Sequence, residues 1–395
     1  MTQAWPVVDL FSGAGGMSCG FSRHSGFELI GAADAQIGKP SAAAGSLGCN
    51  ATYAAGIGLT PIEADLSRAD PADVLDAMGL ARQCPAVLVA SPPCTGFSRA
   101  IASNHVRDDR RNGLVGRVGD YAELLRPDIV LVENARELVT GRFGGHLRSL
   151  LGRLDDLGYA AIADTHFFTD FGLPQRRERA IVVAARRPLR LRGLGSLWHG
   201  WRIDVKACHV RRAIWDLLPV RPGRPNPDDP LHVSPAFRAD VNLRRLAAVP
   251  RDGGGWADLV GHPDHASLLT PAMAGRAARG KFGSHPDIYG RMWWDRPAPT
   301  IKRECSHIGN GRYAHPEQDR LCTVREMSIL QGFPRDYPFA GTLSNMYRHI
   351  GDAVPPLISY QLAGLCEWIL SGARPDLASL LLPGCQVSTG DLLRA

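Results

Sequence analysis

Long hydrophobic runs are missing from this sequence. Its longest apolar stretches, such as AIVVAA (180–185) and LASLLLP (377–383), are far shorter than the roughly 20 residues that a transmembrane helix needs. The first residues, MTQAWPVVDLF, also lack the basic segment of a signal peptide, and Asp9 interrupts their apolar run. We therefore expect no membrane partner and a location in the bacterial cytoplasm or nucleoid.

Cysteine pairs at the spacing of a metal site are absent as well. The nine cysteines are odd in number and scattered, and no CxxC pair occurs. The sequence therefore predicts neither a zinc site nor a disulfide framework, and we expect no metal cofactor. Scattered free thiols of this kind are typical of a reducing cytoplasm.

What the sequence does contain is the composition of a globular protein. The chain has 395 residues, of which 45% are hydrophobic and 21% charged, so it has room for two domains and a large core. Its net charge of +6 permits a polyanionic partner without requiring one. Neither an internal repeat nor a low-complexity tract is visible.

Residues 6 to about 186 alternate strand-like and helix-like segments. Helical patterns occupy 69–79 and 144–158, and the second carries leucines at three- and four-residue spacing ahead of a glycine. This alternation predicts an α/β fold with a parallel sheet wrapped by helices. The candidate strands are PVVDLF (6–11), FELIGAAD (27–34), PAVLVAS (85–91), DIVLVEN (128–134) and AIVVAAR (180–186).

The composition and the periodicity of the sequence change after about residue 190. Residues 191–299 are rich in Pro, Gly, Arg and Trp and show little periodicity, which indicates a second, smaller and irregular domain. Residues 300–375 return to helical patterns, with a capped helix near 323–332 and a buried helix opened by prolines at 355–372. Residues 376–395 have the character of an accessory tail.

The first candidate strand ends in a glycine turn, DLFSGAGG (9–16). Such a turn lets the backbone and the N–H groups of the following helix approach a ligand, so it indicates a nucleotide-type cofactor. A dinucleotide fingerprint would need a third glycine where Ser18 stands, which weakens an NAD interpretation. Asp34 closes the next strand at the distance expected of a ribose-binding acid. A purely structural turn remains the alternative.

Two further strand ends carry reactive side chains. Cys94 follows two prolines and precedes Gly96, so it is either a small buried hydrophobe or a nucleophile on a rigid turn. Glu133 ends another strand and is delivered to the same edge of the sheet, where a carboxyl can act as an acid or a hydrogen-bond donor. The charged segment QRRER (175–179) is either a solvated loop or part of the same site.

Six segments, in this order, resemble the cytosine-5 DNA methyltransferase family, and the resemblance covers about residues 6–370. They are DLFSGAGG (9–16), SPPCTGFS (91–98), ENAREL (133–138), QRRER (175–179), RLCTVREMSILQGFP (320–334) and GDAVPPLISYQLAG (351–364). The resemblance implies a Rossmann-like methyltransferase domain formed by residues 1–190 and 300–375. Residues 191–299 would be an inserted target-recognition domain that reads double-stranded DNA.

The resemblance also implies a mechanism in which Cys94 attacks carbon-6 of a cytosine flipped out of the duplex. Carbon-5 then accepts a methyl group from S-adenosylmethionine, the co-substrate. Glu133 would hold ring nitrogen-3 and the exocyclic amine, Arg179 would bind oxygen-2, and Arg177 would support the site or the phosphates. The residues expected to touch DNA are Ser98, Gln175 and Thr300.

For the co-substrate, the resemblance assigns Phe11 to the adenine, Asp34 to the ribose hydroxyls and Asp65 to the adenine amine. The full set of residues expected to form the pocket is Phe11, Gly13, Ala14, Gly15, Asp34, Asp65, Leu66, Pro93, Leu114, Asp352, Ala353 and Val354. Two departures stand out. Ala135 replaces the family's usual valine after Glu-Asn, and Asp352 replaces its usual asparagine and adds a negative charge near the pocket.

Other functions compete with this interpretation. A tRNA methyltransferase would share the chemistry, but its relatives typically have a Gln after Pro-Pro-Cys and a Cys-Phe-Thr block, and this chain has neither. A zinc deaminase would need PCxxC, which Phe97 breaks. An NAD-dependent oxidoreductase would leave Cys94 and Glu133 without a joint role, and a DNA-binding regulator without activity would not need them. We expect the enzyme to act as a monomer. The sequence is compatible with a cognate restriction enzyme as a partner but does not predict one.

Overall fold

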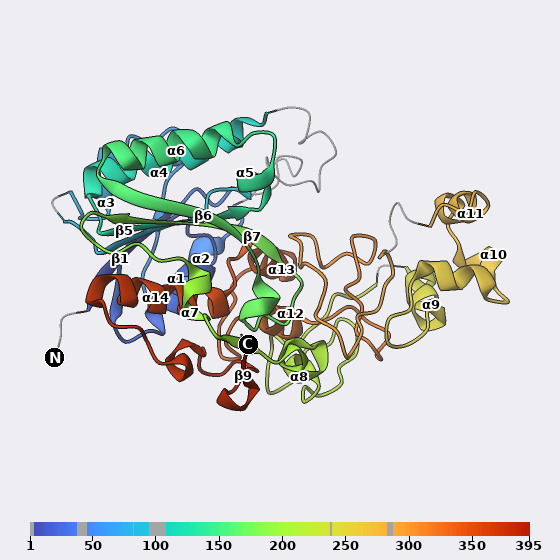
Figure 1. Cartoon of the computed structure of the whole chain (residues 1–395). Helices are drawn as coiled ribbons and strands as arrows, with labels where there is room; N and C mark the ends of the chain where they lie inside the picture. The colour runs from blue at the N-terminus through green and yellow to red at the C-terminus, as the bar shows by residue number, and fades with distance from the viewer. Residues whose placement is uncertain (1–3, 38–45, 82, 95–107, 238, 283–286) are drawn as a thin grey trace.

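A seven-stranded sheet forms the centre of one half of the computed structural model (Figure 1). The structure describes residues 4–37, 46–81, 83–94, 108–237, 239–282 and 287–395. The strand order is β3-β2-β1-β4-β5-β7-β6, and β7 runs antiparallel to both of its neighbours, whereas the other paired strands are parallel. The strands are β1 (Trp5–Leu10), β2 (Phe27–Asp34), β3 (Ile62–Glu63), β4 (Val87–Ala90), β5 (Ile129–Ala135), β6 (Tyr159–Phe167) and β7 (Glu178–Arg186).

Helices cover both faces of this sheet, as Figure 1 shows. Their bounds are α1 (Gly16–Ser22), α2 (Cys49–Ile57), α3 (Pro71–Ala77), α4 (Leu114–Leu125), α5 (Glu137–Thr140), α6 (Gly145–Asp156), α7 (Leu194–Leu197) and α14 (Pro356–Ser371). The predicted α/β architecture is confirmed. The expectation of a wholly parallel sheet is wrong at β7, because the short β6–β7 connection (168–177) leaves no room for a helical crossover and reverses the chain.

The alternation of side chains along each strand creates two hydrophobic cores, one on each face of the sheet. In β4, Val87 and Val89 face α1 and α14, whereas Leu88 and Ala90 face α3, α4 and α6. The same two-residue period holds in β5 and β7. Because both faces are buried, these strands are almost continuously apolar, and this is what made them recognisable in the sequence.

The helices begin where the sequence supplies a cap. Asp70 accepts a hydrogen bond from the Ala72 amide at the start of α3, and Pro71 occupies its first turn. In α12 (Val324–Leu330), Thr323 and Glu326 form the predicted capping box. The helix α14 begins behind Pro355 and ends at Gly372, which has a φ of 77°. The predicted helices near 323–332 and 355–372 are confirmed.

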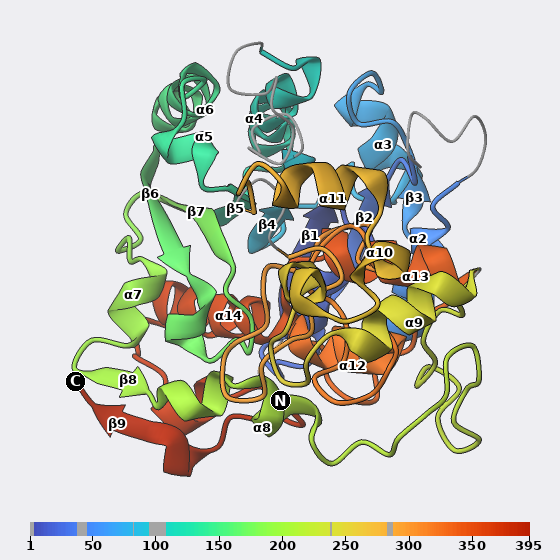
Figure 2. The same ribbon diagram turned by 90° about the vertical axis from the view of Figure 1, so that its right-hand side faces the viewer.

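The other half of the molecule is irregular and built around a core of its own (Figures 1 and 2). This core unites residues from both sides of position 299, among them Trp256, Met292, Tyr313 and Phe333. Helices α9, α10 and α11 project from it (Figure 1). The bounds are α8 (Val210–Ile214), α9 (Asp240–Ala248), α10 (His265–Leu268), α11 (Pro271–Ala277), α12 (Val324–Leu330) and α13 (Leu343–Asp352).

Buried arginines stabilise this half in place of regular secondary structure. Arg291 is fully buried and donates to four backbone carbonyls, those of Leu246, Val249, His315 and Gln318. Such bonds satisfy carbonyls that no sheet or helix would otherwise pair. The arginine-rich composition of this region therefore serves its folding as well as any contact with DNA.

The last residues of the chain pack against the sheet domain. Strand β9 (Leu392–Arg394) pairs antiparallel with β8 (Trp201–Ile203). Leu380, Leu382 and Val387 join the core beneath α14. The segment 194–208 shares that core through residues such as Trp198. The domain boundaries at 190, 299 and 375 stay predictions, but the tail is an integral part of the packing.

Candidate active site

Cys94 lies just after the end of β4, on a turn that the neighbouring strand holds in place. The side-chain amide of Asn134, in β5, donates to the carbonyl of Pro92 at 2.9 Å, and its oxygen accepts from the Ala135 amide. Asn134 is fully buried, so these bonds carry no competition from water. The asparagine next to Glu133 thus fixes the Pro-Pro-Cys turn relative to β5.

Glu133 and Arg179 form a buried ion pair beside this turn. Their register places Ala135 opposite Arg179, so Glu133 is the diagonal neighbour of Arg179 on the same face of the β5–β7 pair. The Arg179 Nε lies 3.1 Å from Glu133 Oε1, and the two side chains are 16% and 8% exposed. Each of the two buried charges thus compensates the other, and both side chains are in position to contact a polar ligand.

Arg177 is buried, and its charge lies close enough to interact with those of Glu133 and Arg179. Its guanidinium donates to the carbonyls of Ile301, at 3.2 Å, and Ala353, at 3.4 Å. Burial lowers the pKa of Arg177, and the nearby charge of Arg179 lowers it further. Arg177 therefore joins the QRRER segment to two segments from the C-terminal part of the chain, one at Ile301 and one at Ala353.

The Cys94 thiol lies within the electrostatic reach of these groups. Burial raises the pKa of Cys94, and Glu133 adds to the rise, whereas Arg179 and Arg177 act in the opposite direction. The resting thiol is therefore protonated near neutral pH, with two cations beside it that stabilise the thiolate once a proton is removed. The three strand ends thus bring together all four residues predicted to be catalytic.

The three residues expected to touch DNA fall in different settings. Ser98 lies outside the described residues. Gln175 is fully buried, and its amide is engaged with Leu330, Gln331 and Ile301, so its contact with DNA stays a prediction. The hydroxyl of Thr300 donates to the Arg176 carbonyl at 2.6 Å. Gln175 and Thr300 therefore join the β7 side of the site to the segment that follows residue 298.

The glycine turn after β1 is tightly bent. Gly13 and Gly15 have φ values of 52° and 84°, and Phe11 takes the left-handed region at 58° although it is bulky. Asp34, at the end of β2, accepts from the Gly13 amide at 3.0 Å and from the Gln36 amide at 2.6 Å. Strain at a bulky residue next to a conformationally demanding turn is typical of a ligand site.

Two distant segments pack directly onto this turn. A methyl group added at Gly16 would lie 2.3 Å from the Val354 carbonyl, so Ala353 and Val354 contact the start of α1. The hydroxyl of Tyr337 donates to the Ala14 carbonyl at 2.7 Å, and a methyl group at Gly15 would lie 2.5 Å from that hydroxyl. Tyr337 therefore supports the turn from behind, a contact that the sequence did not predict.

Asp9 is a second unpredicted feature of the turn. It is fully buried at the end of β1 and accepts a hydrogen bond from Ser18 at 2.5 Å, and Ser18 in turn lies 2.7 Å from the Tyr53 hydroxyl. Burial raises the pKa of Asp9 to about 7. Its second oxygen, Oδ1, has no hydrogen-bond partner within the described residues.

The remaining residues predicted for the pocket come from several separate segments. Asp65 closes a turn by accepting from the Ser67 amide and hydroxyl, and the buried Leu66 is fixed by Arg117, which donates to its carbonyl. Leu114 begins α4, and Pro93 is exposed beside Cys94. Asp352 ends α13 and faces Arg303, whose Nε lies 3.4 Å from its carboxylate.

These features fit S-adenosylmethionine. The turn at Gly13 leaves open space where a side chain would begin, Asp34 offers carboxylate lone pairs for hydroxyl groups, and the half-buried Phe11 provides apolar surface. Within the described ranges, neither a cluster of three or more metal-ligating side chains nor a helix long and apolar enough to cross a membrane occurs.

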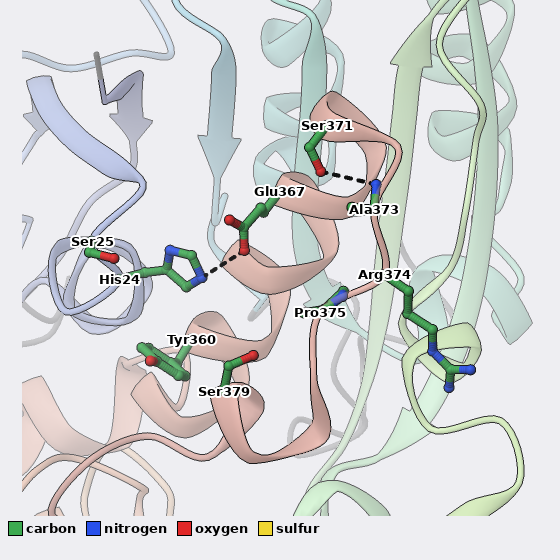
Figure 3. Close-up of a pocket in the computed structure, with 9 residues that line it drawn as sticks. All are labelled: His24, Ser25, Tyr360, Glu367, Ser371, Ala373, Arg374, Pro375 and Ser379. Atoms are coloured by element: carbon green, nitrogen blue, oxygen red, sulfur yellow. Dashed lines mark hydrogen bonds and ion pairs between the residues drawn. The ribbon is translucent and has the colours of Figure 1, made fainter. Parts of the chain in front are cut away.

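A separate pocket of about 370 Å³ lies at the end of α14, away from these residues (Figure 3). His24 points toward Glu367 there, at 3.4 Å, and its ring packs on Phe27 and Tyr360. His24 and Glu367 are paired with each other, and Arg374 donates to the Leu197 carbonyl. The pocket contains none of the predicted catalytic residues.

Solved structures share this fold across nearly the whole chain. A prophage-encoded Escherichia coli protein, described as a DNA modification methyltransferase, has a TM-score of 0.63, covers 93% of this chain and all of its own, and is 19% identical. The methyltransferase EhMeth of Entamoeba histolytica has a TM-score of 0.59, 15% identity and coverage of 94% and 99%. The fold is thus the Rossmann-like fold of methyltransferases, which confirms the predicted class.

Sequence comparison identifies the family. The model of the C-5 cytosine-specific DNA methylases matches residues 6–368, so the chain belongs to that family. The Type II methylase M.HgiDII of Herpetosiphon aurantiacus is 31% identical over 93% of this chain and 96% of its own. The Type II methyltransferase M.AgeI of Thalassovita gelatinovora is 28% identical over 90% and 98%.

The chain is therefore a DNA (cytosine-5)-methyltransferase, which transfers a methyl group to carbon-5 of cytosine in DNA, as the sequence predicted. The family uses S-adenosylmethionine as its co-substrate. The alternative of an NAD-dependent oxidoreductase is wrong, because the family match extends through the catalytic and return segments as well as the glycine turn.

Proposed function

We propose that Cys94 is the nucleophile of this methyltransferase and that Glu133, Arg177 and Arg179 form the rest of its catalytic site. The observation that supports this most directly is the buried Arg179–Glu133 contact of 3.1 Å beside the Cys94 turn. A carboxyl group and a guanidinium next to a thiol match the ring nitrogen, exocyclic amine and oxygen-2 of cytosine.

In this mechanism the Cys94 thiol first gives its proton to a base. Its sulfur then forms a bond to carbon-6 of an extruded cytosine, while the carboxyl of Glu133 hydrogen-bonds nitrogen-3. The ring electrons displaced by this bond move to carbon-5, and Arg179 holds oxygen-2 in place. S-adenosylmethionine, when bound, supplies an electrophilic methyl group for carbon-5. Loss of the carbon-5 proton to a base then restores the double bond and expels the Cys94 thiolate.

The co-substrate pocket would be formed by the glycine turn, Asp34, and the Asp352–Val354 segment. The strained Phe11, the orphan oxygen of Asp9 and the carboxylate of Asp34 support this assignment. Phe11 and Leu66 would contact the adenine, Asp34 the ribose hydroxyls and Asp65 the adenine amine. Pro93 and Leu114 would complete the wall next to Cys94.

We also propose that the enzyme acts as a monomer on double-stranded DNA, with residues 191–299 reading the sequence, and that it works in the bacterial cytoplasm or nucleoid. The Type II names of its relatives support a partnership with a restriction enzyme. Ser98 and Thr300 would contact the DNA backbone, and Gln175 would act on DNA by positioning the segment that holds Thr300.

The test is bisulfite sequencing of DNA from cells that express the enzyme, together with transfer of labelled methyl groups in vitro. We expect 5-methylcytosine in one recurring duplex context, labelling of duplex DNA but not of tRNA, and loss of both signals in Cys94→Ser. Labelling of tRNA without labelling of duplex DNA, or full activity in Cys94→Ser, would contradict the proposal.

A further inference from the structure

Asp352 places a carboxylate at the end of a helix, with 38% of its side chain exposed. It is the last residue of α13, and a helix C-terminus carries partial negative charge, so an acidic side chain there is destabilising. The acidic groups that face it are Asp34 and Glu304, and the cations that face it are Arg303 and Arg177. Asparagine, which the family usually has at this position, would carry no charge.

Arg303 is the cation in contact with this carboxylate. Its Nε lies 3.4 Å from Asp352 Oδ2, whereas the guanidinium of Arg177 is bonded to the carbonyls of Ile301 and Ala353. Apart from Asp352, Arg303 Nε has no polar partner among the described residues. The positive charge of Arg303 and the negative charge of Asp352 therefore balance each other through this contact.

The same guanidinium reaches the opposite side of the pocket. Arg303 Nη2 donates to the carbonyl of Ile37 at 3.3 Å, and Ile37 follows Asp34 by three residues. The backbone of Arg303 is itself fixed, because a methyl group added at Gly351 would lie 2.4 Å from the Lys302 carbonyl. Arg303 thus connects the Asp34 loop to the Asp352 segment.

We propose that Arg303 is a positioning residue for the co-substrate: it joins the Asp352 segment to the Ile37 loop and neutralises the aspartate that replaces the family's asparagine. The proposal rests on the assignment of this pocket to S-adenosylmethionine. Without Arg303, the charges of Asp352 and Asp34 repel each other, and the two sides of the pocket separate. With asparagine at position 352, this repulsion is absent.

A double-mutant cycle tests this coupling. The dissociation constants of S-adenosylmethionine and S-adenosylhomocysteine are measured by calorimetry, without DNA, for wild type, Arg303→Gln, Asp352→Asn and the double variant. We expect Arg303→Gln to weaken binding about tenfold, a size typical of coupling between contacting residues. We expect Asp352→Asn alone to change binding less than about threefold. The double variant should recover only part of the loss, because the bond from Arg303 to the Ile37 carbonyl is still missing.

Three comparisons separate positioning from a general loss of structure. Arg303→Lys keeps the charge but lacks the planar fork, so it should bind with intermediate affinity. Arg187→Gln, which removes an exposed contact with Asp155, should bind like wild type. In turnover assays, Arg303→Gln should raise KM for S-adenosylmethionine while KM for duplex DNA stays unchanged.

Arg303→Gln that binds like wild type, or that is equally weak with asparagine at position 352, would overturn the proposal while the pocket assignment stands. A wild-type enzyme that binds neither probe, with or without DNA, would instead overturn the pocket assignment and this proposal with it. If Arg303→Gln does not fold, the comparison of Arg303→Lys with and without Asp352→Asn gives the same test.

Discussion

In the proposed site, Cys94 is a weak nucleophile that Glu133 and Arg179 would prepare for reaction. Burial keeps the thiol protonated at rest, and the cations beside it favour the thiolate once a base or a bound ring removes the proton. Bound cytosine would complete the site, because the ring takes up the polar contacts that Glu133 and Arg179 now make with each other.

Asp9 should make the stability of the enzyme depend on pH. The pKa of Asp9 is about 7 in the folded chain, compared with an ordinary value of 3.8, so folding retains a proton that the unfolded chain releases. The stabilisation is therefore present below pH 4 and is lost as the pH rises toward 8. Over this range Asp9→Asn should gain up to about 4 kcal/mol in unfolding free energy relative to wild type.

Urea unfolding at pH 4, 6 and 8 measures this difference. Ser18→Ala provides a second check, because the hydrogen bond from Ser18 lowers the pKa of Asp9. Without that bond, the loss of stability should extend to higher pH. A difference between Asp9→Asn and wild type that stays constant from pH 4 to pH 8 would contradict the assignment of a raised pKa.

At the level of residues, the sequence predicted the members of the site better than the contacts that hold them. Strand ends meet at one edge of a sheet, so the convergence of Cys94, Glu133 and Arg179 could be expected. The bonds of Gln175 to Leu330 and Ile301 could not, because they join residues more than 120 positions apart and leave no local pattern. The same holds for Arg303 and Ile37.

At the level of elements, the glycine turn combines a conformational requirement with a steric one. Gly15 needs a positive φ, as glycines at many turns do, but its missing side chain also makes room for the Tyr337 hydroxyl. Gly58 has the same φ of 84° and nothing within 4 Å of the place where a methyl group would be added. The two positions therefore form a matched pair.

Gly15→Ala should weaken S-adenosylmethionine binding at least about tenfold, because the new methyl group displaces Tyr337 and the Ala14 carbonyl that it holds. Gly58→Ala carries the same backbone strain, about 1 kcal/mol, and should bind like wild type. Calorimetric titration of both variants gives the comparison. Equal affinities of the two variants would show that Tyr337 does not support the turn.

The elements that could be predicted from the sequence are those whose pattern of burial is regular along their whole length. Strands buried on both faces, and helices such as α6 with one apolar stripe, have a clear period. Strand β6 was missed because it is half exposed at the sheet edge and its residues YAAIADTHF mix small, polar and apolar types. The antiparallel direction of β7 was missed because direction leaves no mark on the residues of a buried strand.

At the scale of the whole molecule, the region expected to read DNA packs into a core that it shares with residues 300–353. Among the described residues, only the small cluster of Val249, Leu259 and Leu268 lies wholly inside that region. Residues 300–353 also supply Arg303, Tyr337 and Asp352 to the proposed co-substrate pocket. Movement of the recognition region would therefore be transmitted to the pocket through packed side chains. The net charge of +6 would strengthen its hold on DNA at low salt.

The central claim is that Cys94 bonds to a cytosine extruded from duplex DNA, and a 5-fluorocytosine oligonucleotide tests it most directly. Fluorine cannot leave carbon-5 as a proton does, so the adduct becomes permanent once the methyl group is transferred. With S-adenosylmethionine and the correct site, the account predicts a complex that survives denaturation and a modified peptide containing Cys94. If wild-type enzyme methylates the unmodified site but separates from the fluorinated one under denaturing conditions, or is crosslinked at another residue, the account is contradicted.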